Sequence, residues 1–178
     1  AASDLRVEVV LRSPDGSGEF RAEAQPAADG WQAVVSVADA KLWWPNGFGE
    51  QPLYTADVRL IGNSGVLDER TLRIGLRTLT VNTDKDEWGR KFAFEVNGVQ
   101  IFSMGADYIP EDNLLGRLSR ERSGKLIRDC VRANFNTIRV WGGGFYLDDY
   151  FYDLCDEYGL IVWQDLMFSC GTYDLTPE

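Results

Sequence analysis

The sequence predicts two parts, a β-sandwich followed by alternating strands and helices. In residues 1–82, apolar residues recur at every second position, which is the period of half-buried strands. From residue 99 onward, short apolar runs alternate with stretches whose apolar residues follow the helical period. Between the two parts lies TDKDEWGRK, residues 83–91, a polar stretch typical of a linker or a long hairpin loop.

The first part is expected to form short strands joined by turns. The alternating or apolar runs are residues 5–11, 20–24, 31–37, 54–60 and 72–76. Gly62-Asn63-Ser64-Gly65 supplies a turn rich in residues that tolerate positive φ. The apolar positions then shift parity to Leu79 and Val81, which indicates a bulge or a strand that changes sheets. About six or seven short strands in this length fit an immunoglobulin-like sandwich.

The second part opens with a hairpin. Phe92, Phe94 and Val96 lead into Asn97-Gly98, which is the strongest short signal for a hairpin turn. A strand over residues 99–104 is expected to follow. This strand would be the first of the alternating strand–helix series.

Two helices and two further strands complete the series. Leu126, Ile127, Cys130 and Val131 share one helical face and predict a helix over residues 120–134. A second helix is expected to start at Asp148 or Asp149 as N-cap and to stop at Gly159. Its apolar face consists of Phe151, Leu154, Cys155 and Tyr158. The strands are expected at residues 137–141 and 160–164.

The order strand–helix–strand–helix–strand predicts parallel strands with right-handed crossovers. Such a unit is half of a doubly wound fold or the first three of the eight units of a (β/α)8 barrel. No G-x-G-x-x-G follows the first strand, so a dinucleotide site is poorly supported. Few residues follow Asp165, so the chain is expected to stop inside its second domain with an unpaired edge strand.

Composition excludes several classes of function. A net charge of −10 argues against nucleic acid and anionic membranes as partners, because phosphate binding needs clustered Lys and Arg. No apolar run is long enough to span a membrane.

The absence of histidine excludes Ser-His and Cys-His nucleophiles and His-bearing zinc sites. The three cysteines, Cys130, Cys155 and Cys170, are odd in number and form no CxxC, so neither a disulfide framework nor a four-cysteine metal site is expected. Carboxylates therefore remain as the candidate catalytic groups.

Polar residues gather where the parallel strands are expected to end. Active sites of barrels lie at the carboxyl ends of the strands. The three clusters are residues 105–112, 139–144 and 163–165. Alternation puts Arg139 and Trp141 on one side of their strand, and Trp163 and Asp165 on one side of the next. An arginine inside a barrel needs a carboxylate partner, which is either Asp165 or an acidic group outside this chain.

Each of these features also has a structural explanation. Arg139 and Asp165 could form a purely structural salt bridge. Gly142, Gly143 and Gly144 suit the close approach of a ligand and equally suit an irregular loop. Trp141 and Trp163 could be stacking walls for a sugar ring or ordinary core residues.

Four stretches resemble glycoside hydrolase family 2, and within it most closely the β-mannosidase branch. They are LWWPNGFGEQPLY (42–54), GLRTL (75–79), FAFEVNGVQIFSMGADYIPED (92–112) and IRVWGGGFYLDDYFYDLCDEYGLIVWQDLMFSC (138–170). The resemblance covers nearly the whole chain in the right order. It implies an immunoglobulin-like β-sandwich at residues 1–82, followed at residues 83–178 by the first β/α units of a TIM (β/α)8 barrel, which is incomplete.

The resemblance also implies roles for residues. Arg139 matches the arginine beside the catalytic nucleophile, and Trp141, Trp163 and Asp165 match positions that shape the terminal-sugar pocket. Asp107 and Tyr108 stand where the branch usually shows Asn-Trp, so their sugar contacts depart from the family pattern.

The catalytic residues themselves are expected outside this chain. The resemblance implies two glutamates, an acid/base and a nucleophile, and it places both beyond Glu178. The acid/base belongs to an Asn-Glu dipeptide in this retaining family, and no Asn-Glu dipeptide occurs in the chain. No catalytic residue is therefore expected within this chain.

The function expected from the resemblance is that of a retaining exo-β-mannosidase, of which this chain alone would be inactive. No cofactor and no metal are expected, and the partners would be β-linked mannosides or other carbohydrates and the rest of the barrel. The alternatives are other family 2 activities (exo-β-glucosaminidase, β-galactosidase, β-glucuronidase) and a non-catalytic carbohydrate-binding or scaffold module. Localisation stays open, with a soluble bacterial protein, cytoplasmic or exported, as the expectation.

Overall fold

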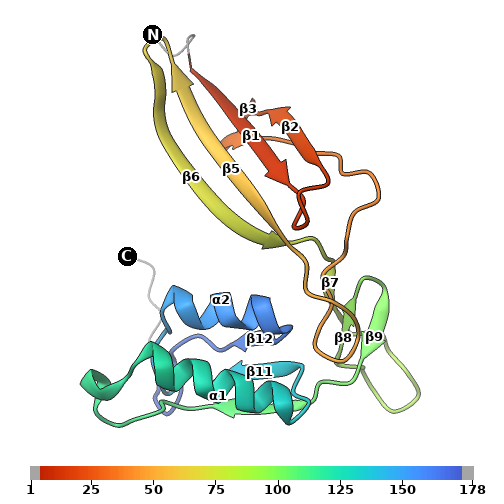
Figure 1. Cartoon of the computed structure of the whole chain (residues 1–178). Coiled ribbons are helices and arrows are strands. Elements are labelled where there is room, and N and C mark those ends of the chain that lie inside the picture. The colour runs from red at the N-terminus through yellow and green to blue at the C-terminus, as the bar shows by residue number, and fades with distance from the viewer. Residues whose placement is uncertain (1–4, 174–178) are drawn as a thin grey trace. The chain divides into compact units, whose positions relative to one another are not determined.

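The computed structural model describes residues 5–173 and divides the chain into two compact units (Figure 1). Unit 1 comprises residues 1–42 and 52–76, and unit 2 comprises residues 43–51 and 77–178. Segment 43–51 therefore belongs to unit 2 although it lies between two stretches of unit 1. The predicted boundary between residues 82 and 83 stays a prediction. Glu178, beyond which the catalytic glutamates are expected, lies outside the described residues.

Unit 1 is mostly β and is consistent with a sandwich domain. Its antiparallel sheet has the order β2-β1-β5-β6, and β3 and β4 form a two-stranded sheet. The strands are β1 (Arg6–Arg12), β2 (Glu19–Glu23), β3 (Gln25–Ala27), β4 (Gly30–Gln32), β5 (Leu53–Gly62) and β6 (Gly65–Gly75).

The two faces of the four-stranded sheet differ in polarity, as the alternating sequence predicts. Leu11, Tyr54 and Ala56 are buried on one face, and Val35 and Val37 pack against them. The prediction of a strand over residues 31–37 is wrong, because the strand stops at Gln32. Alternation reports only which side chains are buried, whereas a strand also needs a hydrogen-bonded neighbour. Residues 33–37 cover the sheet without pairing in a ladder.

An antiparallel sheet of three strands opens the second stretch of unit 2. Its order is β7-β8-β9, with β7 at Leu79–Asn82, β8 at Ala93–Val96 and β9 at Val99–Ile101. The parity shift before Leu79 thus marks a chain that changes sheets. Asn97 and Gly98 both have positive φ, 51° and 79°, as the tightest hairpin turns require. Residues 83–92 form a long hairpin loop between β7 and β8.

A parallel sheet of three strands follows, in the order β10-β11-β12. Its strands are β10 (Gly105–Tyr108), β11 (Thr137–Val140) and β12 (Ile161–Gln164). The prediction that residues 99–104 form its first strand is wrong. The Asn97-Gly98 turn commits the residues after it to pair with β8, so the parallel strand begins only at Gly105. The buried Asn136 side chain bonds the connecting residues at Phe102 O and Met104 N.

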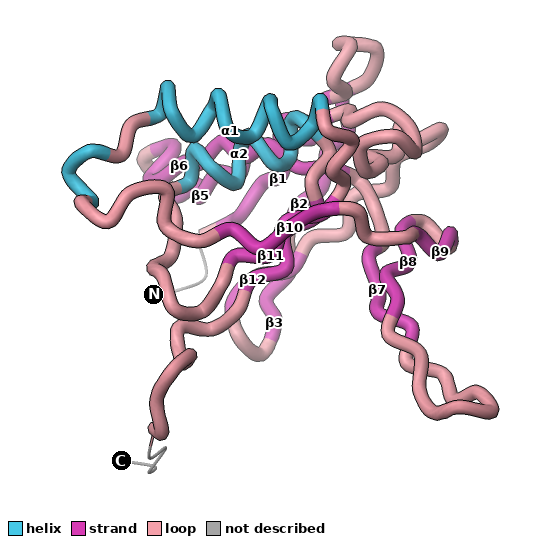
Figure 2. Tube along the Cα trace, turned by 90° about the horizontal axis from the view of Figure 1, so that it is seen from below, coloured by secondary structure: helices cyan, strands magenta, loops and turns pink. Residues whose placement is uncertain are grey.

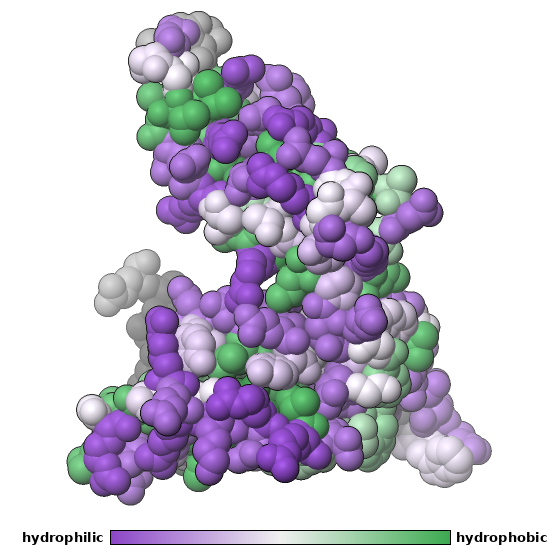
Figure 3. All heavy atoms as spheres, in the orientation of Figure 1, coloured by the Kyte–Doolittle hydropathy of each residue, from purple (hydrophilic) through white to green (hydrophobic). Residues whose placement is uncertain are grey.

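Two helices connect the parallel strands and lie together on one side of them (Figure 2). α1 spans Arg120–Arg132, α2 spans Asp149–Tyr158, and a short 3₁₀ helix, η1, spans Leu115–Arg117. Asp148 caps α2 by accepting the N–H of Phe151, and Gly159 ends it at φ 78°, as predicted. The outward surface of α1 is mostly hydrophilic (Figure 3). Its inward face joins a core with Ile138, Val140 and Phe151.

Segment 43–51 closes the ends of both helices. The Trp43 side chain is 1% exposed, and its indole N–H donates to Asp156 O at 2.8 Å. The Asn46 side chain donates to Phe135 O at 2.9 Å, and the Asn46 backbone N–H donates to Gly159 O at 2.8 Å. Helix ends leave carbonyl groups without partners inside the helix. The segment supplies donors for the carbonyls at and just beyond these two ends.

Candidate active site

Arg139 occupies the middle of a cluster at the carboxyl end of β11. Its neighbours on β11, Ile138 and Val140, are buried against the helices, so Arg139 projects from the opposite face of the sheet. The strand register places Arg139 beside Asp107 of β10 and Trp163 of β12. The alternation of the sequence predicts that Arg139 projects from the face opposite Ile138 and Val140, and the structure confirms this orientation.

A carboxylate partner holds the guanidinium in a two-point contact. Arg139 Nε donates to Asp165 Oδ1 at 3.1 Å, and Nη2 donates to Asp165 Oδ2 at 2.7 Å. Such fork-to-fork pairing fixes direction as well as charge. Asp165 Oδ2 also accepts the backbone N–H of Gly142 at 3.1 Å. The expected carboxylate partner is therefore Asp165, and a backbone group from the glycine turn fixes that carboxylate in turn.

Asp107 makes a second and looser contact with the same guanidinium. Arg139 Nη1 lies 3.3 Å from both oxygens of Asp107. The Asp107 side chain is 55% exposed, compared with 19% for Asp165. Water therefore competes for Asp107 more than for Asp165. One cation faces two carboxylates, so the cluster as a whole is negative.

The ion pair shifts the pKa of both partners. The hydrogen bonds from Arg139 and from the Gly142 N–H hold the pKa of Asp165 below its usual range. The pKa of Arg139 is raised, first by its hydrogen bond to Asp165 and further by Asp107. Both groups therefore stay charged at neutral pH.

Trp163 lies beside the cluster and touches the β7-β8-β9 sheet region. Its ring centre is 5.2 Å from that of Phe92 and 5.8 Å from that of Phe94. The Arg139 guanidinium carbon is 5.7 Å from the centre of the same ring. Sequence reasoning did not connect Phe92 and Phe94 with the site, because these residues precede the parallel strands and no local pattern reports the contact.

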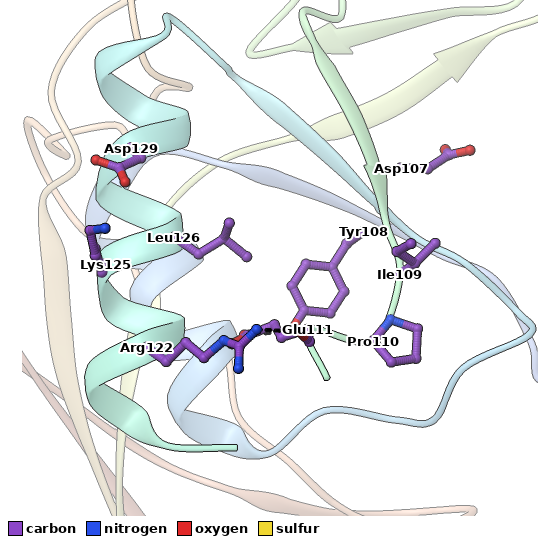
Figure 4. Close-up of a pocket in the computed structure, with 9 residues that line it drawn as sticks. All are labelled: Asp107, Tyr108, Ile109, Pro110, Glu111, Arg122, Lys125, Leu126 and Asp129. Atoms are coloured by element: carbon purple, nitrogen blue, oxygen red, sulfur yellow. Dashed lines mark hydrogen bonds and ion pairs between the residues drawn. The ribbon is translucent and has the colours of Figure 1, made fainter. Parts of the chain in front are cut away.

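Tyr108 does not join the Arg139 cluster. It is the residue after Asp107 on β10, so it projects from the other face of the sheet (Figure 4). Its hydroxyl donates to Glu111 Oε1 at 2.6 Å, and its ring packs on Phe151. Burial and the Glu111 carboxylate raise the pKa of Tyr108, so its hydroxyl stays protonated.

A pocket of about 500 Å³ lies between β10 and α1, and Arg139 is not among its lining residues (Figure 4). Tyr108, Leu126 and Glu111 contribute to its lining. The Glu111 carboxylate is 4% exposed and accepts both the Tyr108 hydroxyl and the Ser123 hydroxyl, the latter at 2.7 Å. These hydroxyls join β10 to α1.

Trp141 follows β11 directly and begins the glycine turn. Its backbone N–H donates to Tyr108 O at 3.0 Å, and its carbonyl accepts the Gly144 N–H at 3.2 Å. The three glycines are each crowded by a different part of this chain: Leu166 O at Gly142, the Trp141 ring at Gly143 and Pro110 at Gly144. Close approach is therefore the reason for the glycines, and the approaching groups belong to this chain.

Within residues 5–173, no group of three or more metal-ligating side chains comes together in a way that could hold a metal ion. Over the same residues, no helix has the length and apolar character needed to cross a membrane.

Comparison with known proteins shows which family the chain is similar to. Residues 1–77 match the sequence model described as "Glycosyl hydrolases family 2". Beta-mannosidase B of Aspergillus terreus is 42% identical over 178 residues, which are 100% of this chain and 21% of that protein. The chain thus spans about a fifth of the length of the curated relatives it matches.

Solved structures show a similarity to the same family. Beta-D-mannosidase from Dictyoglomus thermophilum has a TM-score of 0.76 and 36% identity over 92% of this chain and 21% of its own. A β-glucuronidase from Bifidobacterium dentium has a TM-score of 0.70 over 91% of this chain and 25% of its own, and its 22% identity supports likeness of fold alone. The resemblance of this chain to glycoside hydrolase family 2, and within it to the β-mannosidases, is thereby confirmed.

Proposed function

We propose that the complete protein is a retaining exo-β-mannosidase, in which this chain supplies an immunoglobulin-like domain and the first three β/α units of a (β/α)8 barrel. Three parallel strands with both connecting helices on one side are compatible with such a barrel wall. The similarity to β-mannosidases along the whole chain supports the sugar and the linkage.

The observation that carries the proposal is the fixed guanidinium at the end of β11. Asp165, which itself accepts the Gly142 N–H, orients Arg139 from one side. Among the described residues 5–173, Nη1 contacts the exposed Asp107, which is the weaker of the two acidic contacts. A nucleophilic glutamate from a later barrel strand would meet the guanidinium on this side, and the positive charge would keep that glutamate ionised.

The chemistry needs two carboxylic acids in the complete protein. One protonates the leaving oxygen, and the other attacks the anomeric carbon to form a covalent glycosyl-enzyme, which water then hydrolyses. In retaining enzymes the two carboxyl groups stand about 5–5.5 Å apart. Both would belong to barrel strands beyond Glu178, so the 178-residue chain by itself is expected to have no hydrolytic activity.

The remaining predicted site residues would have supporting roles. Asp165 orients Arg139, and Asp107 borders the proposed terminal-sugar pocket on the Arg139 side of the sheet. Trp141 offers an aromatic wall for the terminal mannosyl ring. Trp163, packed on Phe92 and Phe94, would form the floor beneath Arg139. Tyr108 lies on the opposite face of the sheet, where it bonds Glu111. It would support the strand that carries Asp107 and would not contact the sugar directly.

A panel of aryl glycosides tests the proposal. The complete protein should hydrolyse the aryl β-mannoside faster than the corresponding β-galactoside, β-glucuronide and β-glucosaminide, and NMR should show the β-anomer of mannose as the first product. Preference for another β-glycoside would move the protein to another activity of the family. Sugar-dependent thermal stabilisation without any turnover would instead indicate a carbohydrate-binding module.

A further inference from the structure

We propose that Gly143 is a positioning residue that seats the Trp141 indole, and that this seating sets how tightly the site holds a terminal pyranose ring. The inference rests on the proposed function, because it assigns to Trp141 the wall of the sugar pocket. It adds a residue, Gly143, whose effect on substrate would act entirely through its neighbour.

The geometry of Gly143 carries the inference. A Cβ atom built on Gly143 would lie 2.0 Å from Trp141 Cη2 and 2.2 Å from Cζ2. Real Cβ atoms do not approach other atoms so closely, so the six-membered part of the indole occupies the space that a side chain would take. The ring therefore rests on the backbone of Gly143.

Backbone conformation gives no reason for a glycine here. Glycine is needed where φ is positive, and Gly143 does not have such a φ. The same holds for Gly142 and Gly144. An alanine at 143 is compatible with the chain path, and it conflicts only with the outer atoms of the Trp141 ring, which can move by side-chain rotation.

The two neighbouring glycines differ in what an added methyl group would meet. At Gly142 the obstacle is the backbone oxygen of Leu166 at 2.5 Å, so the chain itself would have to move. At Gly144 the nearest atoms belong to Pro110 at 3.3 Å, a contact that a small shift relieves. Gly144→Ala is therefore the matched control for Gly143→Ala, and Gly142→Ala is unsuitable because it disturbs the turn.

Trp163 and Trp141 are held in place by different kinds of contact. Phe92 and Phe94 both contact the Trp163 ring, and the Arg139 guanidinium also lies near it. Trp163 is thus fixed by several partners. The seat of Trp141 is instead the glycine turn itself, so one added carbon at Gly143 is enough to displace it.

The experiment uses the complete protein labelled with 5-fluorotryptophan, with the Trp141 ¹⁹F signal assigned from a Trp141→Phe variant. Gly143→Ala is expected to shift that signal, to raise KM for an aryl β-mannoside roughly tenfold, the scale of one aromatic contact, and to leave kcat within about twofold. Gly144→Ala is expected to change neither the signal nor KM. In a Trp141→Ala background, Gly143→Ala is expected to have no further effect on KM.

Several outcomes would overturn the inference. An unchanged ¹⁹F signal in Gly143→Ala would show that the ring is not seated there. A shifted signal with normal KM, while Arg139→Ala is inactive, would leave the proposed function standing and remove the role of Gly143 in it. A KM increase that persists in the Trp141→Ala background would assign the effect to the backbone. Full activity of Arg139→Ala would instead count against the proposed function.

Discussion

Arg12 in unit 1 and Arg139 in unit 2 have nearly the same immediate surroundings. Each faces two carboxylates: Glu19 and Asp57 for Arg12, and Asp107 and Asp165 for Arg139. The two arginine side chains are 40% and 39% exposed, and the closer acids, Asp57 and Asp165, are 14% and 19% exposed. Neither burial nor the number of ion pairs separates the two clusters.

The difference lies in strand direction. Antiparallel neighbours put opposite ends side by side, so Arg12 at the end of β1 meets Glu19 at the start of β2 and Asp57 within β5. Thr71 takes the other oxygen of Asp57 at 2.7 Å. Parallel strands bring their carboxyl ends together, so residues from three strands and the loops after them converge on Arg139. A convergent edge can receive a ligand, whereas the Arg12 cluster completes a sheet surface.

The largest expected effect separates the two arginines by activity. In the complete protein, Arg139→Ala should lower kcat/KM by about a hundredfold or more, as for loss of a charged group at a reacting centre. Arg12→Ala should leave kcat/KM unchanged. Steady-state kinetics on an aryl β-mannoside, with thermal unfolding as a check on folding, measures both. Equal losses in the two variants would break the comparison.

The next effect concerns the acids that orient each arginine. Asp165→Asn removes the charge that directs Arg139 and should lower kcat about ten- to a hundredfold through misplacement of the guanidinium. Asp57→Asn is the matched change in unit 1 and should leave kcat unaltered. A normal kcat in Asp165→Asn would mean that Arg139 needs no orienting partner.

A smaller effect is expected at Asp107. Its contact with Arg139 is long and exposed, so Asp107→Asn should change kcat/KM by less than about fivefold, within the range of a surface ion pair. The comparison with Asp165→Asn in the same assay shows which acid controls the guanidinium. A loss as large as that of Asp165→Asn would assign the two acids equal roles.

The smallest effect is that of pH. Hydrogen bonds from Thr71 and Arg12 lower the pKa of Asp57, and the hydrogen bond from Arg139 lowers that of Asp165. A lowered pKa means that each pair contributes stability above the ordinary Asp value, about 3.9, and loses it as pH falls through the lower folded value. Between pH 7 and about 5 neither pair should therefore change. Carboxyl ¹³C NMR should find both midpoints below the ordinary value, and a midpoint above it for Asp165 would contradict the geometry.

Local patterns predicted much of unit 2. The Asn97-Gly98 turn, the cap at Asp148 and the stop at Gly159 follow from the chemistry of single residues, and all three are confirmed. The first helix ends at Arg132, two residues before the predicted Asn134, because Asn134 has a positive φ of 63°. The orientation of Arg139 followed from strand alternation, which a buried helix-facing side enforces.

Long-range contacts were beyond these patterns. No local signal places Phe92 beside Trp163, or Trp43 beside α2. The glycine run was equally ambiguous in sequence, because its cause is the position of the Trp141 ring and of Leu166 O. The start of β10 was missed because apolar residues recur from Val99 to Met104, and only pairing decides which neighbour a strand joins.

Segment 43–51 has a consequence for how the polypeptide is made. A ribosome delivers Trp43 and Asn46 long before Asp156 and Gly159, the residues whose carbonyls they bind. The emerging chain must therefore keep this stretch available while the strands on both sides of it pair with one another. Trp43 is removed from water only when α2 has formed. Segment 43–51 is made before α2, so it reaches its final packing only after α2 has been synthesised. For the same reason, no single protease cut divides the polypeptide into its two units.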